Sequence, residues 1–312
     1  MSSVIPLPNA KFSAPIDLHR VRSLFGVPSR IAESDFLRRE IAARMHERLA
    51  LIKIAPQRVL DAGCGEGADL SPLQKRYPGA HVLGIDGALP VASVARARQA
   101  GGLSAMNRLL GKWLPGRSDI GGSPSVLCGD FARLPLGVNA VDMVWSNLAL
   151  HWHPQPDQVF TEWRRILSIE GLLMFSCFGP DTFKELRTAF AAVDDAAHTL
   201  SFVDMHDFGD MMVNAGFSTP VMDMETITVT YASVDKLMAD VRAWGGNPLL
   251  TRRRGLLGRQ AWMRVVASLQ AMRRENGVIP LTFEVIYGHA FRPAPVKTAA
   301  GESIIRFEPR KK

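Results

Sequence analysis

The 312-residue sequence is poor in cysteine and has no long apolar run. Its three cysteines, Cys64, Cys128 and Cys177, are too few and too widely spaced for a disulfide framework or a paired-cysteine metal site. No apolar segment approaches the roughly 20 residues that cross a bilayer, and residues 1–22 lack the apolar core of a secretory signal. We therefore expect no membrane span, no bound metal and a reducing, cytoplasmic compartment.

Positive charge is concentrated in the last part of the chain. The formal net charge is +7, and the segment from Arg242 to Lys312 carries 14 Lys and Arg against 4 Asp and Glu. Such an imbalance suggests an acidic partner, although the same arginines can simply form a solvated surface. Both interpretations are open at this point.

Short apolar segments alternate with helical patterns along the first 180 residues. Alternation of this kind predicts a parallel sheet with helices on both faces, because right-handed crossovers return each strand to the same sheet. The expected strands are 58–62, 81–86, 125–128, 141–146 and 171–177. The expected helices are 36–52, 69–77, 89–99 and 156–167, the first of them capped by Ser34 or Asp35.

The remaining segments complete one α/β domain over residues 25–293. Two β-rich runs, 221–231 and 281–291, are the natural last strands of a seven-stranded, doubly wound and mostly parallel sheet. The helix-rich stretch 233–277 between them predicts a helical cap inserted over the carboxyl edge. We expect an extended lead-in at 1–24, and a loose basic tail at 294–312. Residues 101–124, with six glycines and two prolines, form an insertion.

A glycine-rich turn follows the first predicted strand. Gly63, Gly65 and Gly67 let the backbone approach a ligand where a Cβ atom would clash, and Asp86 at the end of the second strand is placed to bind both hydroxyls of a ribose. This arrangement serves two cofactor classes, because Gly63-x-Gly65-x-x-Ala68 with an acid about 20 residues later also fits the dinucleotide-binding pattern.

Residues at the other strand ends separate the two classes. Asp61 is placed to meet the ammonium of a methionine moiety, whereas a pyrophosphate would be repelled by its carboxylate. Asp130 and Phe131 follow the third strand, where they can contact an adenine, and Asn147 ends the fourth on the methionine side; Phe131 can equally be core. These spacings resemble class I S-adenosylmethionine-dependent methyltransferases, which implies cofactor-binding roles for these residues and disfavours a nicotinamide dehydrogenase.

Motifs in the second half narrow the resemblance. The strings are Ser146-Asn-Leu-Ala-Leu-His-Trp152, Phe178-Gly-Pro-Asp-Thr-Phe-Lys-Glu-Leu-Arg187, Met205-His-Asp-Phe-Gly-Asp210, Pro220-Val-Met-Asp-Met224 and Glu284-Val-Ile-Tyr-Gly-His289. Over residues 25–293 the chain resembles the BioC family, the malonyl-[acyl-carrier protein] O-methyltransferases of biotin synthesis. A related methyltransferase-fold assembly factor of respiratory complex I, associated with arginine modification, shares much of the pattern and is the alternative, as is another small-molecule methyltransferase.

The resemblance implies chemistry that needs few catalytic groups. A malonyl carboxylate is already ionised at pH 7, with a pKa around 4, so the enzyme must only orient it and exclude water. Candidates for this are Arg187, His151 and His289, with Trp152 beside them, although each of these side chains can also be purely structural. A nucleic-acid methyltransferase is disfavoured, because no Asn/Asp-Pro-Pro-Tyr/Phe motif follows the fourth strand.

The family also implies a protein partner. Acyl-carrier proteins present an acidic helix, so we expect their contact surface on the basic cap. The predicted contact residues are Arg252, Arg253, Arg254 and Arg259.

Overall fold

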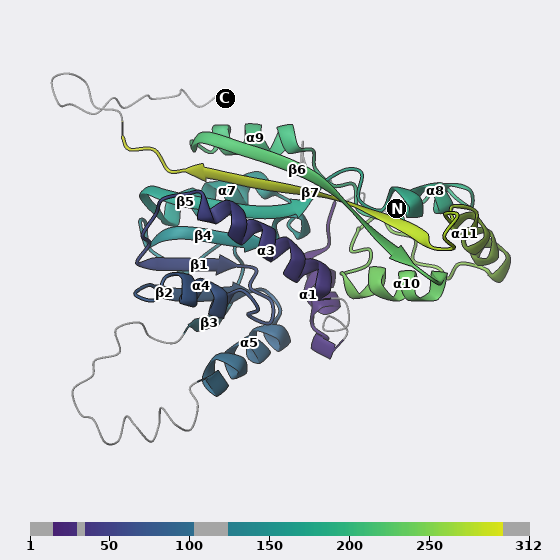
Figure 1. Ribbon diagram of the computed structural model, residues 1–312, viewed down its shortest axis with the longest axis horizontal. Helices are drawn as coiled ribbons and strands as arrows, with labels where there is room; N and C mark the ends of the chain where they lie inside the picture. The colour runs from purple at the N-terminus through teal and green to yellow at the C-terminus, as the bar shows by residue number, and fades with distance from the viewer. Residues whose placement is uncertain (1–14, 30–34, 103–123, 296–312) are drawn as a thin grey trace, which may run out of the picture.

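A seven-stranded sheet forms the centre of the molecule in a computed structural model, which describes residues 15–29, 35–102 and 124–295 (Figure 1). The strand order is β3-β2-β1-β4-β5-β7-β6. The first five strands pair in parallel, and β7 is antiparallel to both of its neighbours. The strands are β1 (Arg58–Ala62), β2 (His81–Asp86), β3 (Ser125–Cys128), β4 (Val141–Asn147), β5 (Leu167–Phe178), β6 (Ser218–Tyr231) and β7 (Ile279–Phe291). The predicted doubly wound, mostly parallel sheet is confirmed.

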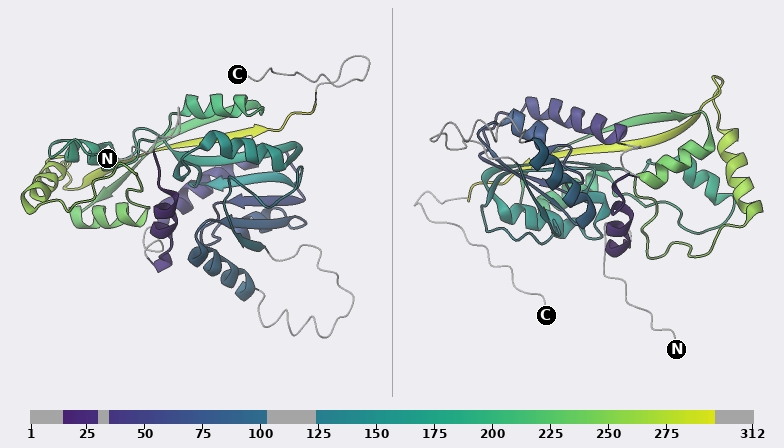
Figure 2. Two further views of the ribbon diagram at one scale, coloured as in Figure 1. Left: turned by 180° about the vertical axis from the view of Figure 1, so that it is seen from behind. Right: turned by 90° about the horizontal axis from the view of Figure 1, so that it is seen from below.

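Helices cover both faces of the sheet because its inner strands are apolar on both sides (Figure 2). α3, α4 and α5 share one apolar core with the sheet, and α7 and α9 share the other. Fully buried aromatic side chains sit in each core, among them Trp145 on the first face and Phe160 on the second. The helices on these faces are α3 (Phe36–Ala50), α4 (Leu70–Arg76), α5 (Leu89–Gly102), α7 (Pro156–Ile166) and α9 (Met205–Asn214).

The antiparallel pair of β6 and β7 extends beyond the other strands. Strand β5 ends at Phe178, which pairs with Val285, whereas β6 and β7 stay paired out to Tyr231 and Ile279. The extension carries α8 (Lys184–Ala191), α10 (Val234–Ala243) and α11 (Arg259–Ala271), whose apolar residues join the first core (Figure 1). The sequence therefore predicted correctly that helices are inserted between the last two strands.

One expectation about the N-terminus is wrong. Residues 18–25 are not extended but form the helix α1 (Leu18–Phe25), capped by Asp17, whose carboxylate accepts from the Arg20 backbone N–H. The preceding residues are fixed to the cap, since Ile16 forms a β-bridge with Leu249. A favourable cap and tertiary pairing outweigh the prolines earlier in the segment.

Several expectations concern residues outside the described ranges. These are the insertion at 101–124 apart from its ends, most of the 294–312 tail, the first 14 residues and Ser34. Asp35 is described, but its side chain makes no cap hydrogen bond and instead pairs with Arg38 and Arg39. Among the described helices none is long and apolar enough to cross a membrane.

Candidate active site

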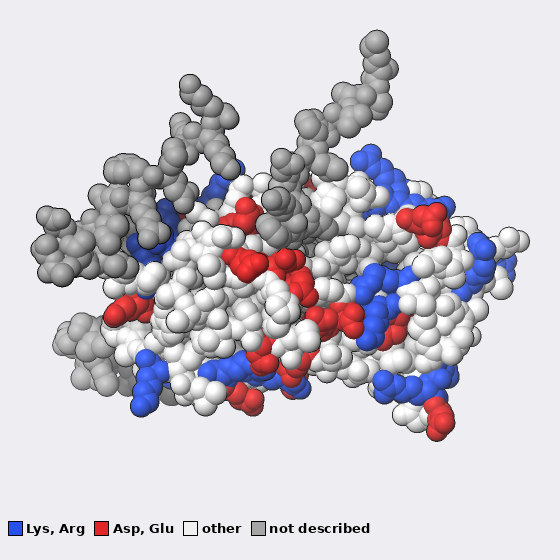
Figure 3. Space-filling model, turned by 90° about the horizontal axis from the view of Figure 1, so that it is seen from above, with Lys and Arg blue, Asp and Glu red and all other residues white. Residues whose placement is uncertain are grey.

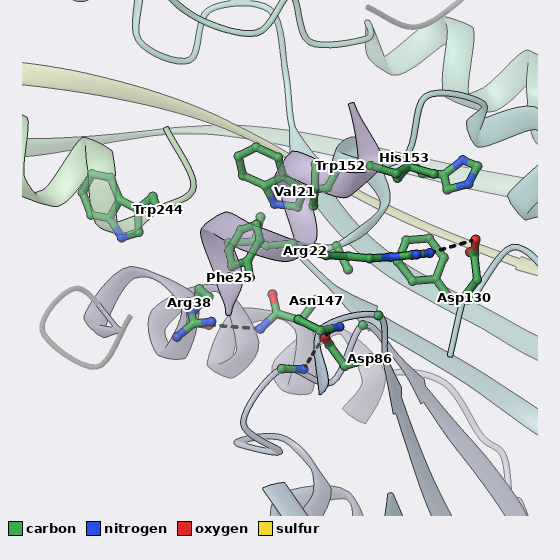
Figure 4. A pocket seen from close by; sticks show the side chains of 18 of the residues that line it. Val21, Arg22, Phe25, Arg38, Asp86, Asp130, Asn147, Trp152, His153 and Trp244 are labelled. Atoms are coloured by element: carbon green, nitrogen blue, oxygen red, sulfur yellow. Dashed lines mark hydrogen bonds and ion pairs between the residues drawn. The ribbon is translucent and has the colours of Figure 1, made fainter. Parts of the chain in front are cut away.

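A pocket opens at the carboxyl ends of β1, β2 and β4, facing α1 (Figure 4). Its cavity volume is about 120 Å³. The strand order reverses between β1 and β4, which is where open α/β sheets bind ligands. The lining includes six residues predicted from sequence: Gly63, Gly65, Asp86, Asp130, Phe131 and Asn147.

The glycine loop has a backbone that only glycine adopts easily. Gly63 and Gly65 have φ angles of +83° and +52°. The Gly63 and Cys64 amides donate to the Ile85 carbonyl, which ties the loop to β2. A Cβ atom at Gly63 would lie 2.2 Å from the Cβ of Ala149, so the loop packs directly against the segment after β4.

Gly67 has a different part in this turn. It has a φ of +76°, and a Cβ atom there would lie 3.0 Å from Leu70 and 3.1 Å from Ala95. It does not line the pocket. Gly67 therefore shapes the packing of the loop on α4 and α5, and direct contact with a cofactor, as the sequence suggested, is not supported by its position.

Asp86 holds the loop and faces the pocket at the same time. Its two carboxylate oxygens accept from the backbone N–H groups of Gly65, at 3.0 Å, and Ala88, at 2.8 Å. Burial raises the pKa of Asp86, while these two hydrogen bonds and the charges of Arg38 and Arg22 act in the opposite direction. Each oxygen keeps a lone pair for a further donor, as binding of a ribose diol requires.

A second hollow adjoins the pocket and contains two buried acids, Asp61 and Asp69. Asp61 is 1% exposed, and its Oδ2 has no hydrogen-bond partner. Burial raises the pKa of Asp61 well above its ordinary value, and the neighbouring carboxylates of Asp69 and Asp86 raise it further. A buried, unpartnered carboxylate is costly, and a cationic ligand in this hollow would supply the missing donor.

Asn147 links the two hollows. Its Nδ2 donates to the Arg38 carbonyl and to Asp69 Oδ2, and its Oδ1 accepts from Ser176. The Trp145 indole also donates to Asp69 Oδ2, at 3.1 Å. These bonds fix the orientation of Asp69 before any ligand binds. Sequence reasoning missed Asp69, although its place within the glycine loop region was a usable signal.

The far end of the pocket is formed by Asp130 and Phe131 after β3. Asp130 lies 3.5 Å from the Arg22 guanidinium, and its other oxygen accepts from the Ala132 N–H. The Phe131 carbonyl accepts from the Trp163 indole. Because its ring lines the pocket, Phe131 is more than a core residue.

The three residues predicted to act on the acceptor lie outside this pocket. The Arg187 guanidinium donates to the backbone carbonyls of Thr182 and Pro180, both at 2.5 Å, so it is committed to the turn before α8. His289 pairs with Met174 and lies in register with Asp61, but β4 and β5 separate its strand from β1, and it does not line the pocket. Neither position supports a substrate-orienting role.

His151 is buried beside the pocket rather than in it. It is 7% exposed and packs on Trp152 and Phe178, with ring centroids 4.9 and 4.8 Å away. Burial lowers the pKa of His151 to about 3. The ring is therefore neutral near pH 7 and cannot supply a positive charge to a carboxylate. Its neighbour Trp152, by contrast, does line the pocket.

The pocket wall contains two arginines that the sequence did not single out. Arg22 comes from α1 and Arg38 from α3. Sequence signals existed for both, since Leu18, Val21 and Phe25 have helical spacing around Arg22, and Arg38 follows the first buried residue of a predicted helix. Among the described residues, no cluster of His, Cys, Asp and Glu is suited to hold a metal ion.

Comparison with known structures supports the fold. The chain superposes on the YcgJ protein of Bacillus subtilis with a TM-score of 0.54 and 12% identity, covering 80% of this chain and 98% of that one. It superposes on protein BH2331 of Bacillus halodurans with a TM-score of 0.53 and 16% identity, covering 81% and 99%. Likeness at these identities shows a common architecture and nothing about the substrate.

Comparison with known sequences is more specific. A family model described as a methyltransferase domain matches residues 60–175. The malonyl-[acyl-carrier protein] O-methyltransferase of Laribacter hongkongensis is 44% identical over 94% of this chain and 96% of its own length. Those of Gallionella capsiferriformans and Nitrosospira multiformis are 43% and 45% identical over 93% and 90% of this chain. Together with the pocket, this similarity shows that the chain belongs to the malonyl-[acyl-carrier protein] O-methyltransferase family, whose cofactor is S-adenosylmethionine.

Proposed function

We propose that this protein transfers the methyl group of S-adenosylmethionine to the free carboxylate of a malonyl thioester carried by acyl-carrier protein, a step of biotin synthesis. The malonyl-[acyl-carrier protein] O-methyltransferases of Laribacter hongkongensis and Gallionella capsiferriformans each match more than 90% of this chain. The observation that carries the proposal is the buried, unpartnered Oδ2 of Asp61 beside a glycine loop, where it can accept from a cationic group.

The side chains along the pocket suit the parts of the cofactor in turn. Asp61 would meet its ammonium group, and Asp86 would accept from the ribose hydroxyls. Asp130 and Phe131 would hold the adenine. Arg38, which borders both hollows, would pair with the methionine carboxylate, and its charge already acts on the nearby carboxylates.

Bound S-adenosylmethionine supplies a methyl group made electrophilic by its sulfonium charge. The acceptor carboxylate would take this methyl group, and the electron pair of the broken carbon–sulfur bond would stay on sulfur. The carboxylate and sulfonium charges would cancel and no proton would move, so this chemistry requires no general base. This agrees with two buried histidines, His153 in the pocket wall and His151 beside it, whose pKa values are lowered by burial.

An aromatic wall borders the rest of the pocket. Phe25 from α1 packs edge-on against Trp152 with centroids 5.1 Å apart, and Trp244 at the end of α10 also lines the wall. A low-polarity wall favours a step in which opposite charges cancel, and it excludes water that would solvate the carboxylate. The acceptor would therefore reach the methyl group along this side.

The decisive test is methyl transfer with purified protein. We expect labelled S-adenosylmethionine to label malonyl-carrier protein in a base-labile ester, and the carrier without its malonyl group to stay unlabelled. Asp61→Asn keeps the shape of the side chain but removes the charge, so it should lower cofactor affinity by about tenfold or more. Binding of S-adenosylmethionine without ester formation would overturn the proposed acceptor. Absence of cofactor binding would overturn the whole proposal.

The basic cap is the proposed carrier surface. Lys and Arg side chains, with some Asp and Glu between them, spread over the end of the molecule that carries α8, α10 and α11 (Figure 3). Arg253 already pairs with Asp194 at 2.7 Å, and Arg252 donates to the Leu249 carbonyl. Arg254 and Arg259 are exposed.

Charge reversal tests this surface. Arg254→Glu with Arg259→Glu should lower kcat/KM for malonyl-carrier protein about tenfold at low salt and leave a small malonyl thioester unaffected, because steering acts on the charged carrier. Lys75→Glu, an exposed change on α4 at the far end of the molecule, is the matched control. Equal losses on both acceptors would mean that the arginines serve the fold, and displacement of the carrier by RNA would favour a nucleic-acid partner.

A further inference from the structure

The helix α1 presents one charged residue on an otherwise apolar stripe. Leu18, Val21, Arg22 and Phe25 line the pocket, at the spacing that places residues on one face of a helix. The Arg22 side chain is 46% exposed, so its charge keeps part of its hydration and can change partners. Arg22 therefore offers a positive charge to an anion that enters beside this face.

Arg22 lies across the part of the pocket that the proposed function gives to adenosine. A Cβ atom on Gly87, next to Asp86, would lie 3.4 Å from the Arg22 Nε. At its other end the guanidinium reaches to 3.5 Å from Asp130 (Figure 4). The side chain thus fills the space between the proposed ribose-binding and adenine-binding acids, and it must move for a nucleoside to enter.

The contact with Asp130 is loose. The distance of 3.5 Å is longer than a charged hydrogen bond, and the two side chains are 46% and 28% exposed. Ion pairs of this kind contribute little and are easily exchanged for another partner. The helix itself is better fixed, since the Asp17 amide donates to the Pro248 carbonyl and the Arg20 guanidinium to the Asn247 carbonyl. The side chain of Arg22 can therefore move while α1 stays in place.

We propose that Arg22 is a specificity-determining residue that exchanges one carboxylate for another. Without cofactor it pairs with Asp130; when an adenine amino group takes that acid, Arg22 turns to the acceptor and binds its carboxylate. This rests on the proposed function. Of the two pocket arginines in the described chain, the proposed function assigns Arg38 to the methionine carboxylate, which leaves Arg22 for the acceptor. One guanidinium contact orients the carboxylate and leaves its second oxygen to attack the methyl group.

The exchange predicts opposite effects on the two substrates. Arg22→Ala removes a competitor for the adenosine space, so the affinity for S-adenosylmethionine alone should rise about two- to fivefold. The same variant should raise KM for malonyl-carrier protein about tenfold or more, with a smaller change in kcat. Arg22→Lys should recover part of the acceptor affinity, because it keeps the charge. His19→Ala, an exposed change on the same helix, should alter neither quantity.

Calorimetric titration with S-adenosylmethionine and steady-state kinetics with malonyl-carrier protein measure the two effects. Weaker cofactor binding in Arg22→Ala would overturn the proposal, because Arg22 would then support the cofactor. An unchanged KM would overturn it as well. A structurally damaged variant would lose both affinities together. If the wild-type protein methylates no malonyl acceptor, the proposed function fails, while the titration still decides whether Arg22 competes with the cofactor.

Discussion

Replacing Gly63 by alanine tests whether the glycine loop is built for close packing. Gly63 has a φ of +83°, and its added Cβ atom would lie only 2.2 Å from the Cβ of Ala149. Two independent costs therefore arise at one site. The left-handed backbone conformation is unfavourable for alanine, and the loop must shift away from the segment after β4, which helps to form the cofactor pocket.

The two costs can be estimated separately. The backbone conformation costs about 1–2 kcal/mol for a residue with a Cβ atom, and overpacking of a rigid contact costs about 1–3 kcal/mol. Gly63→Ala should then lower the free energy of unfolding by about 2–5 kcal/mol. Gly65→Ala is the matched control, because Gly65 also has a positive φ of +52° but the nearest atom to its added Cβ is Arg38 Nη1 at 3.8 Å. The free energy of unfolding of Gly65→Ala should therefore fall only by the backbone contribution.

A double-mutant cycle separates the contributions further. Ala149→Gly removes the atom that the new Cβ would meet, so in the Gly63→Ala background it should restore about 1–3 kcal/mol and leave the backbone cost in place. Urea denaturation gives the unfolding free energies, and titration with S-adenosylmethionine reports the state of the pocket. If Gly63→Ala is as stable as Gly65→Ala, or if Ala149→Gly restores nothing, the close contact does not determine the loop.

Three further substitutions test other parts of the site. Asp86→Ala should weaken S-adenosylmethionine binding by roughly 1.5–3 kcal/mol in calorimetry, since charged hydrogen bonds are lost; unchanged affinity, or tighter binding of NAD, would contradict this. Arg187→Ala should leave turnover intact but reduce stability by about 1–3 kcal/mol, because the carbonyls of Pro180 and Thr182 lose their donors. A fall in turnover at unchanged stability would restore its role in catalysis. Burial lowers the pKa of His151 from 6.5 to about 3, so the unfolded chain binds the extra proton and stability falls as the pH drops from 6.5 toward 3. Between pH 7 and pH 5, His151→Phe should lose about 2 kcal/mol less stability than the wild type in urea denaturation, and equal losses would place the titration elsewhere.

The parallel half of the sheet could be predicted because its strands are short apolar runs between helical patterns. Val59 to Ala62 and Val82 to Ile85 are almost wholly buried, and Asp61 is the one charged residue in these two segments. The cofactor-facing residues follow from the same pattern. Once β1 and β2 are identified, Gly63, Gly65 and Asp86 must stand at the carboxyl ends of neighbouring strands, and the structure places them there.

The failure for Arg187 has a local cause. Phe183 adopts a left-handed conformation with a φ of +64° at the start of α8. This turn leaves the carbonyls of Pro180 and Thr182 in need of donors, and Arg187 supplies both. The sequence places Arg187 near the carboxyl edge, but it does not show that the guanidinium is already hydrogen-bonded to backbone carbonyls.

The failure for His289 follows from strand order. Its register, through Met174 and Trp145, places it level with Asp61, but β4 and β5 lie between β7 and β1. His289 is therefore displaced across the sheet from a pocket formed at the ends of β1, β2 and β4. The pocket wall that we propose for the acceptor is formed instead by α1 and the end of α10, through Phe25, Arg22 and Trp244. Strand spacing locates residues at strand ends, whereas these three line one pocket only through tertiary packing. The proposed cofactor residues could therefore be identified from sequence, and the proposed acceptor residues required the structure.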